Sequence, residues 1–321
     1  MLLWFFCSAF MRTFIIGTRG SPLALAQTRF VENYLASQNI PYVIHTIKTT
    51  GDIIQDRPLY EIGGKALFSK EIERCLEEKT IDIAVHSLKD LETPRPKGFE
   101  IVAYLSRADA RDVLVTHFNY DENKVYGCQI NDLAQKSFVG TSAPRRMALL
   151  NYHRPDLQII PLRGNVGTRL GKLNGNKENY DAMIFAKAGL DRLGIAIEGT
   201  AILSKDTMIP AAGQGIVALE CRSDDEETKI LLREMNDPTA QLMAQIERGY
   251  IERLENASCR SAVGIHVEVN YQNLHVRTMV ANPEPKIFNH HFERETSFEA
   301  IWQTLIACTG SRLNTFHKDN P

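Results

Sequence analysis

The chain has 321 residues, with 37 lysines and arginines against 39 acidic residues, and 44% of its residues are hydrophobic. This length favours more than one hydrophobic core, and the composition excludes a disordered, collagen-like or coiled-coil chain. Because the formal net charge is −2, the chain as a whole does not attract nucleic acid or an anionic membrane, and any polyanionic ligand needs a local cluster of cations.

The N-terminal segment, residues 1–10, is apolar but lacks the basic region and the small-residue cleavage site of a signal peptide. We expect residues 1–11 to be an N-terminal extension. No stretch has the roughly 18–20 apolar residues that a membrane span requires. The six cysteines show neither C-x-x-C nor metal-type spacing, which predicts free thiols and a cytoplasmic protein.

The part of the chain before residue 238 alternates β-rich runs with amphipathic segments, which is typical of α/β proteins. We predict strands at residues 14–17, 43–49, 81–85, 113–116, 137–140, 157–162 and 182–185. Ser21 and Pro22 predict the start of a helix after the first of these strands. Thr141, Ser142 and Pro144 predict another helix start, and residues 51–65 have no periodicity and predict a loop.

After about residue 238 the pattern changes, because strands are grouped instead of alternating with helices. We predict strands at residues 263–269, 274–280 and 286–292, and a final helix near residues 297–307. Grouped strands indicate a small α+β domain. We therefore divide the chain into domain 1 (residues 12–107 and 216–236), domain 2 (residues 108–215) and domain 3 (residues 237–321).

Basic residues gather where the predicted strands end and the next helices begin. They are Arg19, Lys89, Arg145, Arg146, Arg163, Arg169 and Arg192. Ligands of open α/β sheets bind outside the carboxyl ends of the strands, and guanidinium groups suit carboxylate or phosphate. Each residue taken singly could be a surface arginine in an ordinary salt bridge. Their shared placement favours a ligand with several anionic groups.

Two other residues stand out near these cations. Asp90 follows the strand at residues 81–85 and is either a helix cap, an ion-pair partner of Lys89, or a carboxylate that stabilises a developing cation on a ligand. Cys259 lies beside Arg260, which favours the thiolate, but it could equally be an inert loop cysteine. The nine histidines show no metal-ligand spacing, so we expect no metal site.

Several short motifs occur together and in one order between about residues 12 and 265. They are RGSPLALAQ at 19–27, VHSLKD at 85–90, GTS at 140–142 followed by Arg145 and Arg146, LRGNVGTRL at 162–170, AGLDRLG at 188–194, and GQG at 213–215 followed by ECR at 220–222. In this combination the chain closely resembles the hydroxymethylbilane synthase (porphobilinogen deaminase) family. The last 55 residues or so match that family only in general layout.

The resemblance implies two α/β domains similar to periplasmic binding proteins around a cleft, plus a small α+β C-terminal domain. It implies a transferase of porphyrin and heme biosynthesis that condenses four porphobilinogen molecules head to tail, with loss of ammonia, onto a covalent dipyrromethane primer. The product, hydroxymethylbilane, is released by hydrolysis. By its place in the motif pattern, Cys259 is the cysteine that carries the dipyrromethane cofactor.

The resemblance also assigns roles to individual residues. Asp90 matches the catalytic aspartate, which holds pyrrole N–H groups and steadies positive charge. The cofactor-binding residues are Lys65, Ser87, Lys89, Thr141, Ser142, Arg145 and Arg146, and the substrate-binding residues are Arg19, Ser21, Arg163, Arg169 and Arg192. The implied partners are porphobilinogen as substrate and uroporphyrinogen III synthase as recipient of the product, for a monomer that binds neither nucleic acid nor a membrane.

Two departures from the family pattern bear on function. Glu61 stands where the family commonly has a lysine, and the residues around Cys259 lack the usual glycines and proline. Two alternatives are open, of which the second is prompted by these departures. The first is a solute-binding protein of the same architecture without catalysis, which would have a secretion signal and no need for Cys259. The second is a degenerate synthase that binds pyrroles but turns over poorly.

Overall fold

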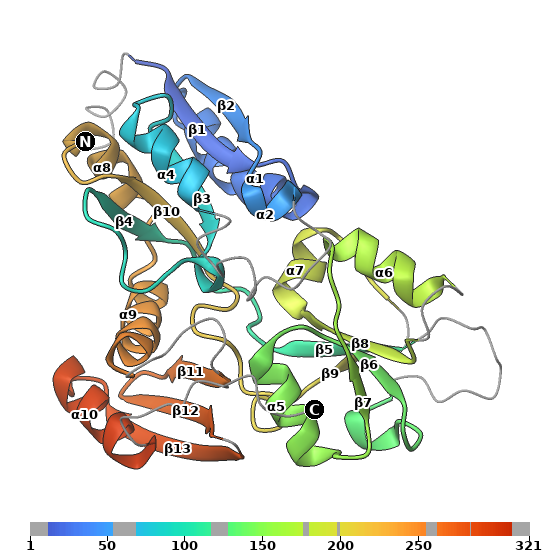
Figure 1. Ribbon diagram of the computed structural model, residues 1–321. Helices are drawn as coiled ribbons and strands as arrows, with labels where there is room; N and C mark the ends of the chain where they lie inside the picture. The colour runs from blue at the N-terminus through green and yellow to red at the C-terminus, as the bar shows by residue number, and fades with distance from the viewer. Residues whose placement is uncertain are drawn as a thin grey trace. The chain divides into compact units, whose positions relative to one another are not determined.

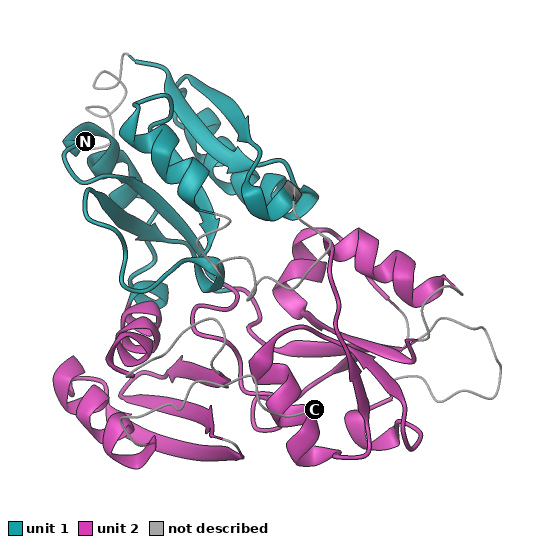
Figure 2. Cartoon of the chain, viewed as in Figure 1, with its two compact units in different colours: residues 1–54, 65–107, 216–241 teal, residues 55–64, 108–215, 242–321 magenta. Residues whose placement is uncertain are grey.

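The computed structural model describes residues 12–53, 69–116, 128–175, 180–197, 200–254, 262–282 and 284–309. The chain divides into two compact units (Figure 2). Unit 1 consists of residues 1–54, 65–107 and 216–241, and unit 2 of residues 55–64, 108–215 and 242–321. Each unit is described by itself below.

Unit 1 is built on a five-stranded sheet with the order β2-β1-β3-β10-β4 (Figure 1). The strands are β1 (Phe14–Arg19), β2 (Tyr42–Ile47), β3 (Ile83–Ser87), β4 (Phe99–Tyr104) and β10 (Val217–Arg222). β1 runs parallel to β2 and β3, whereas β10 pairs antiparallel with β3 and β4. The helices are α1 (Pro22–Ser37), α2 (Thr50–Ile53), α4 (Lys70–Glu77), the 3₁₀ turn η3 (Leu88–Asp90) and α8 (Glu226–Arg233).

Helices cover both faces of this sheet. Val31 and Leu35 of α1 share a buried cluster with Phe14 of β1 and with Leu231 and Leu232 of α8. The opposite face is covered by the apolar side of α4, on which Ile72 and Leu76 pack against Ile81. Both faces are apolar because strands buried on each side carry continuous hydrophobic runs. The carboxyl ends of β1 and β3 therefore remain as places where polar side chains meet solvent.

Unit 2 repeats this arrangement. Its strands are β5 (Asp112–Thr116), β6 (Phe138–Gly140), β7 (Gln158–Ile160), β8 (Ala182–Ala186) and β9 (Ala201–Ile202), in the order β7-β6-β8-β5-β9. β6 is parallel to β7 and β8, and β5 pairs antiparallel with β8 and β9. Its helices are α5 (Pro144–His153), α6 (Val166–Asn174) and α7 (Lys187–Arg192), with a 3₁₀ turn η4 (Ile130–Asp132).

Unit 2 also contains a three-stranded antiparallel sheet of β11 (Val263–Val269), β12 (Asn273–Ala281) and β13 (Pro285–Glu293). Most of α9 (Pro238–Arg253) and all of α10 (Phe298–Thr309) belong to this unit, and both cover one face of that sheet (Figure 1). Ile246 and Tyr250 of α9 pack there with Ile301 and Leu305 of α10. Met279 and Ala281 of β12 join the cluster around α5 instead.

These observations confirm the prediction of two α/β sheets and a small α+β part, and also the helix start at Ser21, whose hydroxyl accepts a hydrogen bond from the Ala24 amide at 3.3 Å. The predicted helix start at Thr141, Ser142 and Pro144 is confirmed at Pro144, where α5 begins, although the N-cap is Ala143 and neither Thr141 nor Ser142. Strands β4, β9 and β10 were not predicted. Of the predicted loop at residues 51–65, α2 covers the beginning, and residues 54–65 lie outside the described residues.

Candidate active site

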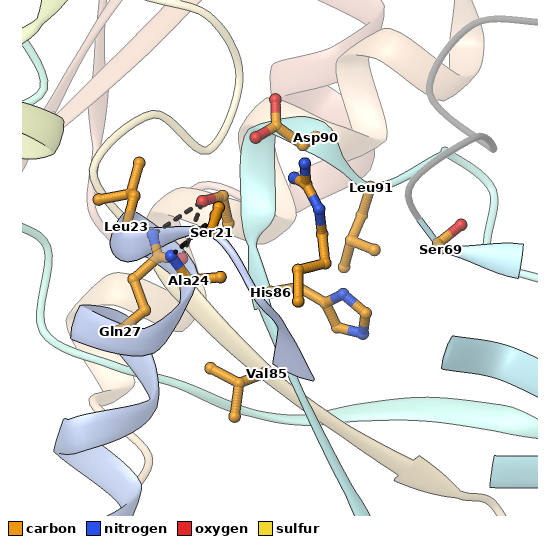
Figure 3. A pocket seen from close by; sticks show the side chains of 11 residues that line it. Ser21, Leu23, Ala24, Gln27, Ser69, Val85, His86, Asp90 and Leu91 are labelled. Atoms are coloured by element: carbon orange, nitrogen blue, oxygen red, sulfur yellow. Dashed lines mark hydrogen bonds between the residues drawn. The ribbon is translucent and has the colours of Figure 1, made fainter. Parts of the chain in front are cut away.

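A pocket lies at the carboxyl ends of β1 and β3 in unit 1 (Figure 3). Its lining residues come from these strands, from the first turns of α1, from the N-cap of α4 and from η3 with its C-cap. They are Arg19, Ser21, Leu23, Ala24, Gln27, Ser69, Val85, His86, Ser87, Asp90 and Leu91. Four residues predicted for the site are among them: Arg19, Ser21, Ser87 and Asp90. The fold thus brings together residues that are up to 71 positions apart in the sequence.

Arg19 ends β1 and is held by a carboxylate that the sequence did not point to. Its Nε donates to Asp52 Oδ2 at 3.2 Å, and its Nη2 donates to Asp52 Oδ1. The Thr49 hydroxyl donates to Asp52 Oδ2 at 2.7 Å. Burial opposes ionisation of Asp52, but the hydrogen bonds from Arg19 and Thr49 outweigh it and hold the pKa of Asp52 below its ordinary value. Arg19 therefore keeps a fixed orientation at the pocket.

Ser21 and Ser87 occupy the two backbone turns that form the pocket. Ser21 caps α1, whose N-terminus presents amide groups and the positive end of the helix dipole. Ser87 ends β3 and exchanges hydrogen bonds with the buried side chain of Gln27, at 2.7 Å and 3.1 Å. The pocket therefore combines a guanidinium, a helix N-terminus and hydroxyl groups, all of which bind anions.

Asp90 is the last residue of η3, and its side chain is exposed in the pocket. Within the part of the chain that the structure describes, its carboxylate makes no hydrogen bond and no ion pair. Neither alternative role therefore holds there, because Ser87 is the N-cap of η3 and Lys89 does not pair with Asp90. An exposed carboxylate next to anion-binding groups is available to a ligand's N–H donors.

A buried ion cluster lies beneath the same turn. Glu220 of β10 accepts from Arg95 Nε at 2.9 Å and Nη2 at 3.0 Å, and its Oε2 lies 3.1 Å from His86 Nε2. Arg95 Nη2 also donates to Glu73 Oε1 at 2.6 Å. Burial raises the pKa of Glu220, but His86 and Arg95 outweigh it and hold that pKa below its usual range. His86 and Glu220 belong to the motifs VHSLKD and ECR, but nothing in the sequence indicates that their side chains lie together.

In unit 2, Arg145 and Arg146 begin α5 and turn their guanidinium groups into the protein. Arg145 Nη2 donates to Asp112 Oδ2 at 2.8 Å, and Arg146 Nη2 donates to Asp112 Oδ1 at 2.8 Å. Main-chain carbonyls of Ile209 and Ile184 accept one hydrogen bond each from the two arginines. Arg145 is 5% and Arg146 is 7% exposed, and one internal carboxylate already pairs with both cations and offsets one of their two charges.

The Asp112 carboxylate is the centre of this cluster. It is fully buried, and Gln214 of the Gly-Gln-Gly motif is a third side chain that donates to it, at 2.8 Å. Burial opposes its ionisation, but Arg145 and Arg146 outweigh that effect and hold the pKa of Asp112 well below its usual range. No signal in the sequence identified Asp112, because it lies at the start of an apolar strand 33 residues before Arg145.

The hydroxyl groups of Thr141 and Ser142 form hydrogen bonds with backbone groups of the protein. The Ser142 hydroxyl donates to the Leu162 carbonyl at 3.0 Å and accepts from the Leu162 amide at 2.7 Å. The Thr141 hydroxyl accepts from the Ala143 amide at 3.3 Å. Both side chains therefore fix the loop between β6 and α5.

The remaining cations of unit 2 lie after β7 and at the end of α7. Arg163 precedes Gly164, whose φ of +107° favours glycine, and Arg169 Nε donates to the Gly164 carbonyl at 2.8 Å. Arg192 Nη2 donates to the Gly215 carbonyl at 2.7 Å. The Arg192 Nε is buried without an acceptor among the described residues, and burial lowers the pKa of this guanidinium while Asp191 opposes the effect.

Lys89 is half-buried in η3 beside the pocket of unit 1. Lys65, Glu61 and Cys259 lie outside the described residues. Cys75, Cys128, Cys221 and Cys308 are free thiols in the described part of the chain. No helix among the described residues is both long and apolar enough to cross a membrane. Among the same residues, no three histidines, cysteines or carboxylates lie close enough together to hold a metal ion.

The sheets and the pocket together define an α/β protein with a pocket lined by cationic and polar groups at the carboxyl ends of its strands. Its sequence matches the family described as porphobilinogen deaminase, dipyromethane cofactor binding domain, over residues 14–230. The chain belongs to this family. The porphobilinogen deaminases of Nitrobacter winogradskyi and Syntrophomonas wolfei are both 42% identical to it, over 84% and 86% of this chain and 83% and 87% of theirs.

The porphobilinogen deaminase of Francisella tularensis subsp. novicida is 41% identical over 86% of this chain and 89% of its own. Among solved structures, a periplasmic substrate-binding protein from Coxiella burnetii matches 73% of this chain and 96% of its own, at 14% identity and a TM-score of 0.42. Likeness at that level shows nothing about what this chain binds.

Membership of the family establishes the activity: the chain condenses porphobilinogen head to tail onto a dipyrromethane cofactor in tetrapyrrole biosynthesis. The pocket of unit 1 fits a pyrrole that carries carboxylates, because it offers Arg19 to a carboxylate and Asp90 to an N–H group. The cations of Arg145 and Arg146 fit such a group less well, since Asp112 already occupies them.

Proposed function

We propose that the pocket of unit 1 is the catalytic centre, with Asp90 as the catalytic residue and Arg19 and Ser21 as substrate-binding residues. One observation carries this proposal: an exposed carboxylate that has no hydrogen-bond or ion-pair partner among the described residues lines the same pocket as a guanidinium and a helix N-terminus. Porphobilinogen carries acetate and propionate groups as well as a pyrrole N–H. The pocket offers a matching group to each.

Each residue then has a defined task. Arg19, oriented by Asp52, binds a carboxylate of the substrate, and the Ser21 hydroxyl and the α1 amides add polar contacts. Asp90 accepts the pyrrole N–H and stabilises the positive charge that develops on the ring as ammonia leaves. The cofactor, when bound, supplies the pyrrole carbon to which the first substrate is joined.

We further propose that Cys259 carries the dipyrromethane and that its carboxylates are bound by Lys65, Ser87, Lys89, Thr141, Ser142, Arg145 and Arg146. Arg145 and Arg146 can bind the cofactor only through N–H groups that do not already donate to Asp112 or to main-chain carbonyls. Arg163, Arg169 and Arg192 would bind the substrate or the growing chain. The buried Arg192 Nε supports this, because a buried donor without an acceptor is costly unless a ligand supplies one.

The proposal extends to the organisation of the chain. Domain 1 consists of residues 12–107 and 216–236, domain 2 of residues 108–215 and domain 3 of residues 237–321. The enzyme acts as a cytoplasmic monomer and passes its product to uroporphyrinogen III synthase.

Activity and intact mass, measured on the same samples, test the site. Asp90→Asn keeps the shape of the side chain but loses its charge, and it should lower kcat by about 10²-fold or more. Its mass should still exceed that of the polypeptide by two linked pyrrole units, mapped to Cys259. Cys259→Ala should have the bare mass and no activity, whereas Cys308→Ala should keep both the added mass and the activity.

Asp224→Asn is the control for Asp90, since Asp224 is an exposed carboxylate of the same unit outside the pocket. This variant should keep native activity. Near-native activity of Asp90→Asn would remove Asp90 from catalysis. Inactive native protein with the bare mass, made in a host rich in porphobilinogen, would favour the degenerate synthase.

A further inference from the structure

The turn that presents Asp90, η3 (Leu88–Asp90), is only three residues long. Among the described contacts, the Leu88 amide donates to the Ile216 carbonyl at 3.1 Å, and the Leu91 amide donates to the Leu88 carbonyl at 3.2 Å. The side chains of Leu88 and Leu91 are buried. The Asp90 carboxylate makes no hydrogen bond and no ion pair among the described residues. The segments that enter and leave the turn therefore help to set the direction of this carboxylate.

Both of those segments contact one buried carboxylate. His86 comes four residues before Asp90, and its Nε2 lies 3.1 Å from Glu220 Oε2. Arg95 comes five residues after Asp90 and donates two hydrogen bonds to Glu220. Glu220 belongs to β10, which pairs antiparallel with β3, so its backbone is fixed in the middle of the sheet. The Glu220 side chain is 0% and the His86 side chain 6% exposed, so water does not weaken this contact. Glu73 of α4 binds Arg95 from the other side.

We propose that Glu220 is a positioning residue for catalysis: through His86 and Arg95 it fixes both ends of the turn that presents Asp90 in the pocket. His86 and Asp90 both line that pocket, so a residue that Glu220 contacts lies in the same pocket as the catalytic carboxylate (Figure 3). Arg95 binds Glu220 with two nitrogens, which fixes direction as well as distance. The inference rests on the proposed catalytic role of Asp90.

A second ion cluster on the same strands provides a matched control. Asp82 directly precedes β3 and accepts from Arg222 of β10 at 3.3 Å and from Arg12 at 3.2 Å. Like Glu220 it is a buried acid paired with arginine, but it lies at the opposite end of β3 from the pocket. Loss of this pair should weaken the fold to a similar degree without moving Asp90.

The experiment compares kcat, KM and thermal stability of Glu220→Gln and Asp82→Asn, each with its cofactor content measured by intact mass. Displacement of a catalytic group by about 1 Å can cost two orders of magnitude in rate. We expect Glu220→Gln to lower kcat by about 10-fold to 100-fold and to change KM less than threefold. Asp82→Asn should lose similar stability and keep kcat within about twofold at 25 °C.

If Glu220→Gln does not fold, substitutions of its partner Arg95 test the same positioning role with a milder change. Arg95→Lys keeps a cation near Glu220 but loses the contact through two nitrogens. It should lower kcat about threefold to tenfold with cofactor content unchanged, whereas Arg95→Met should lower it further. A folded Glu220→Gln or Arg95→Met variant with kcat within twofold of native would overturn the inference, as would an equal loss of kcat in Asp82→Asn.

The two levels of the proposal fail separately. If Asp90→Asn keeps its activity, the assignment of the catalytic residue is wrong, whatever Glu220→Gln does. If Asp90→Asn is inactive and Glu220→Gln is not impaired, the catalytic assignment holds and the positioning role of Glu220 is wrong.

Discussion

Arg19 in unit 1 and the pair Arg145 and Arg146 in unit 2 lie at equivalent points of two sheets with the same strand order. Both sheets have a strand between two parallel neighbours. Arg19 is the last residue of that strand in unit 1, and Arg145 and Arg146 lie in the first turn of the helix that follows it in unit 2. Arg19 faces a pocket, and its partner Asp52 is 29% exposed. The other two arginines are buried around Asp112, which is not exposed at all.

The comparison shows that the position of an arginine in the fold does not determine whether it is available to a ligand. The exposure of its counter-ion determines this. A partly exposed partner such as Asp52 can orient Arg19 and still leave it at the surface of a pocket. A fully buried partner such as Asp112 makes the cations part of the core, where an unpaired charge costs several kcal/mol. Arg145 and Arg146 should therefore matter first for stability, and Arg19 first for binding.

Asp112→Asn separates the two regions most sharply. It leaves two buried guanidinium groups without a carboxylate, and removal of one partner from a buried ion pair costs about 3–5 kcal/mol of unfolding free energy. Asp52→Asn, in a partly exposed pair, should cost about 0.2–1 kcal/mol. Unfolding in urea measures both. Losses of equal size would show that the two regions do not differ in the way proposed here.

Acid should reveal the same difference without a mutation. Arg145 and Arg146 hold the pKa of Asp112 below its ordinary value of about 3.9, so Asp112 stabilises the fold fully above that value. This contribution is lost as the pH falls through the pKa of the folded state, and it is about 1–3 kcal/mol. The stability difference between native protein and Asp112→Asn should therefore narrow from pH 5 toward pH 2. A constant difference would mean that Asp112 is not ionised in the fold.

These counter-ions also mark how far the sequence can predict the structure. The Ser21 and Pro22 signal is local, and it correctly placed the start of α1. Asp112 and Glu220 pair with residues more than 30 positions away, so no local pattern contains the contact. The prediction that cations gather at strand ends was therefore possible. The sequence could not show which of them already have an internal carboxylate.

The fold shows the same limit. β10 is buried at every position, so it lacks the alternation that indicates a strand, and its neighbours β3 and β4 lie more than 100 residues earlier in the chain. Similarly, the sequence suggests Ser142 as a helix cap, but its hydroxyl group forms hydrogen bonds with the backbone of Leu162 instead. In both cases a partner distant in sequence decides the structure, and local propensity does not.

The smallest expected effect concerns Asp52, which forms the partly exposed ion pair with Arg19 in unit 1. If Asp52 orients Arg19 for a substrate carboxylate, Asp52→Ala should raise the KM for porphobilinogen about threefold to tenfold, the loss expected for one surface ion pair and part of a hydrogen bond. The value of kcat should stay within twofold, because Asp90 lies on a different strand end. Asp109→Ala is the control, since Asp109 forms a similar pair with Arg111 but does not line the pocket; its KM should be native. A lower KM in Asp52→Ala would show instead that Asp52 competes with the substrate for Arg19, so that the carboxylate next to the pocket restrains binding.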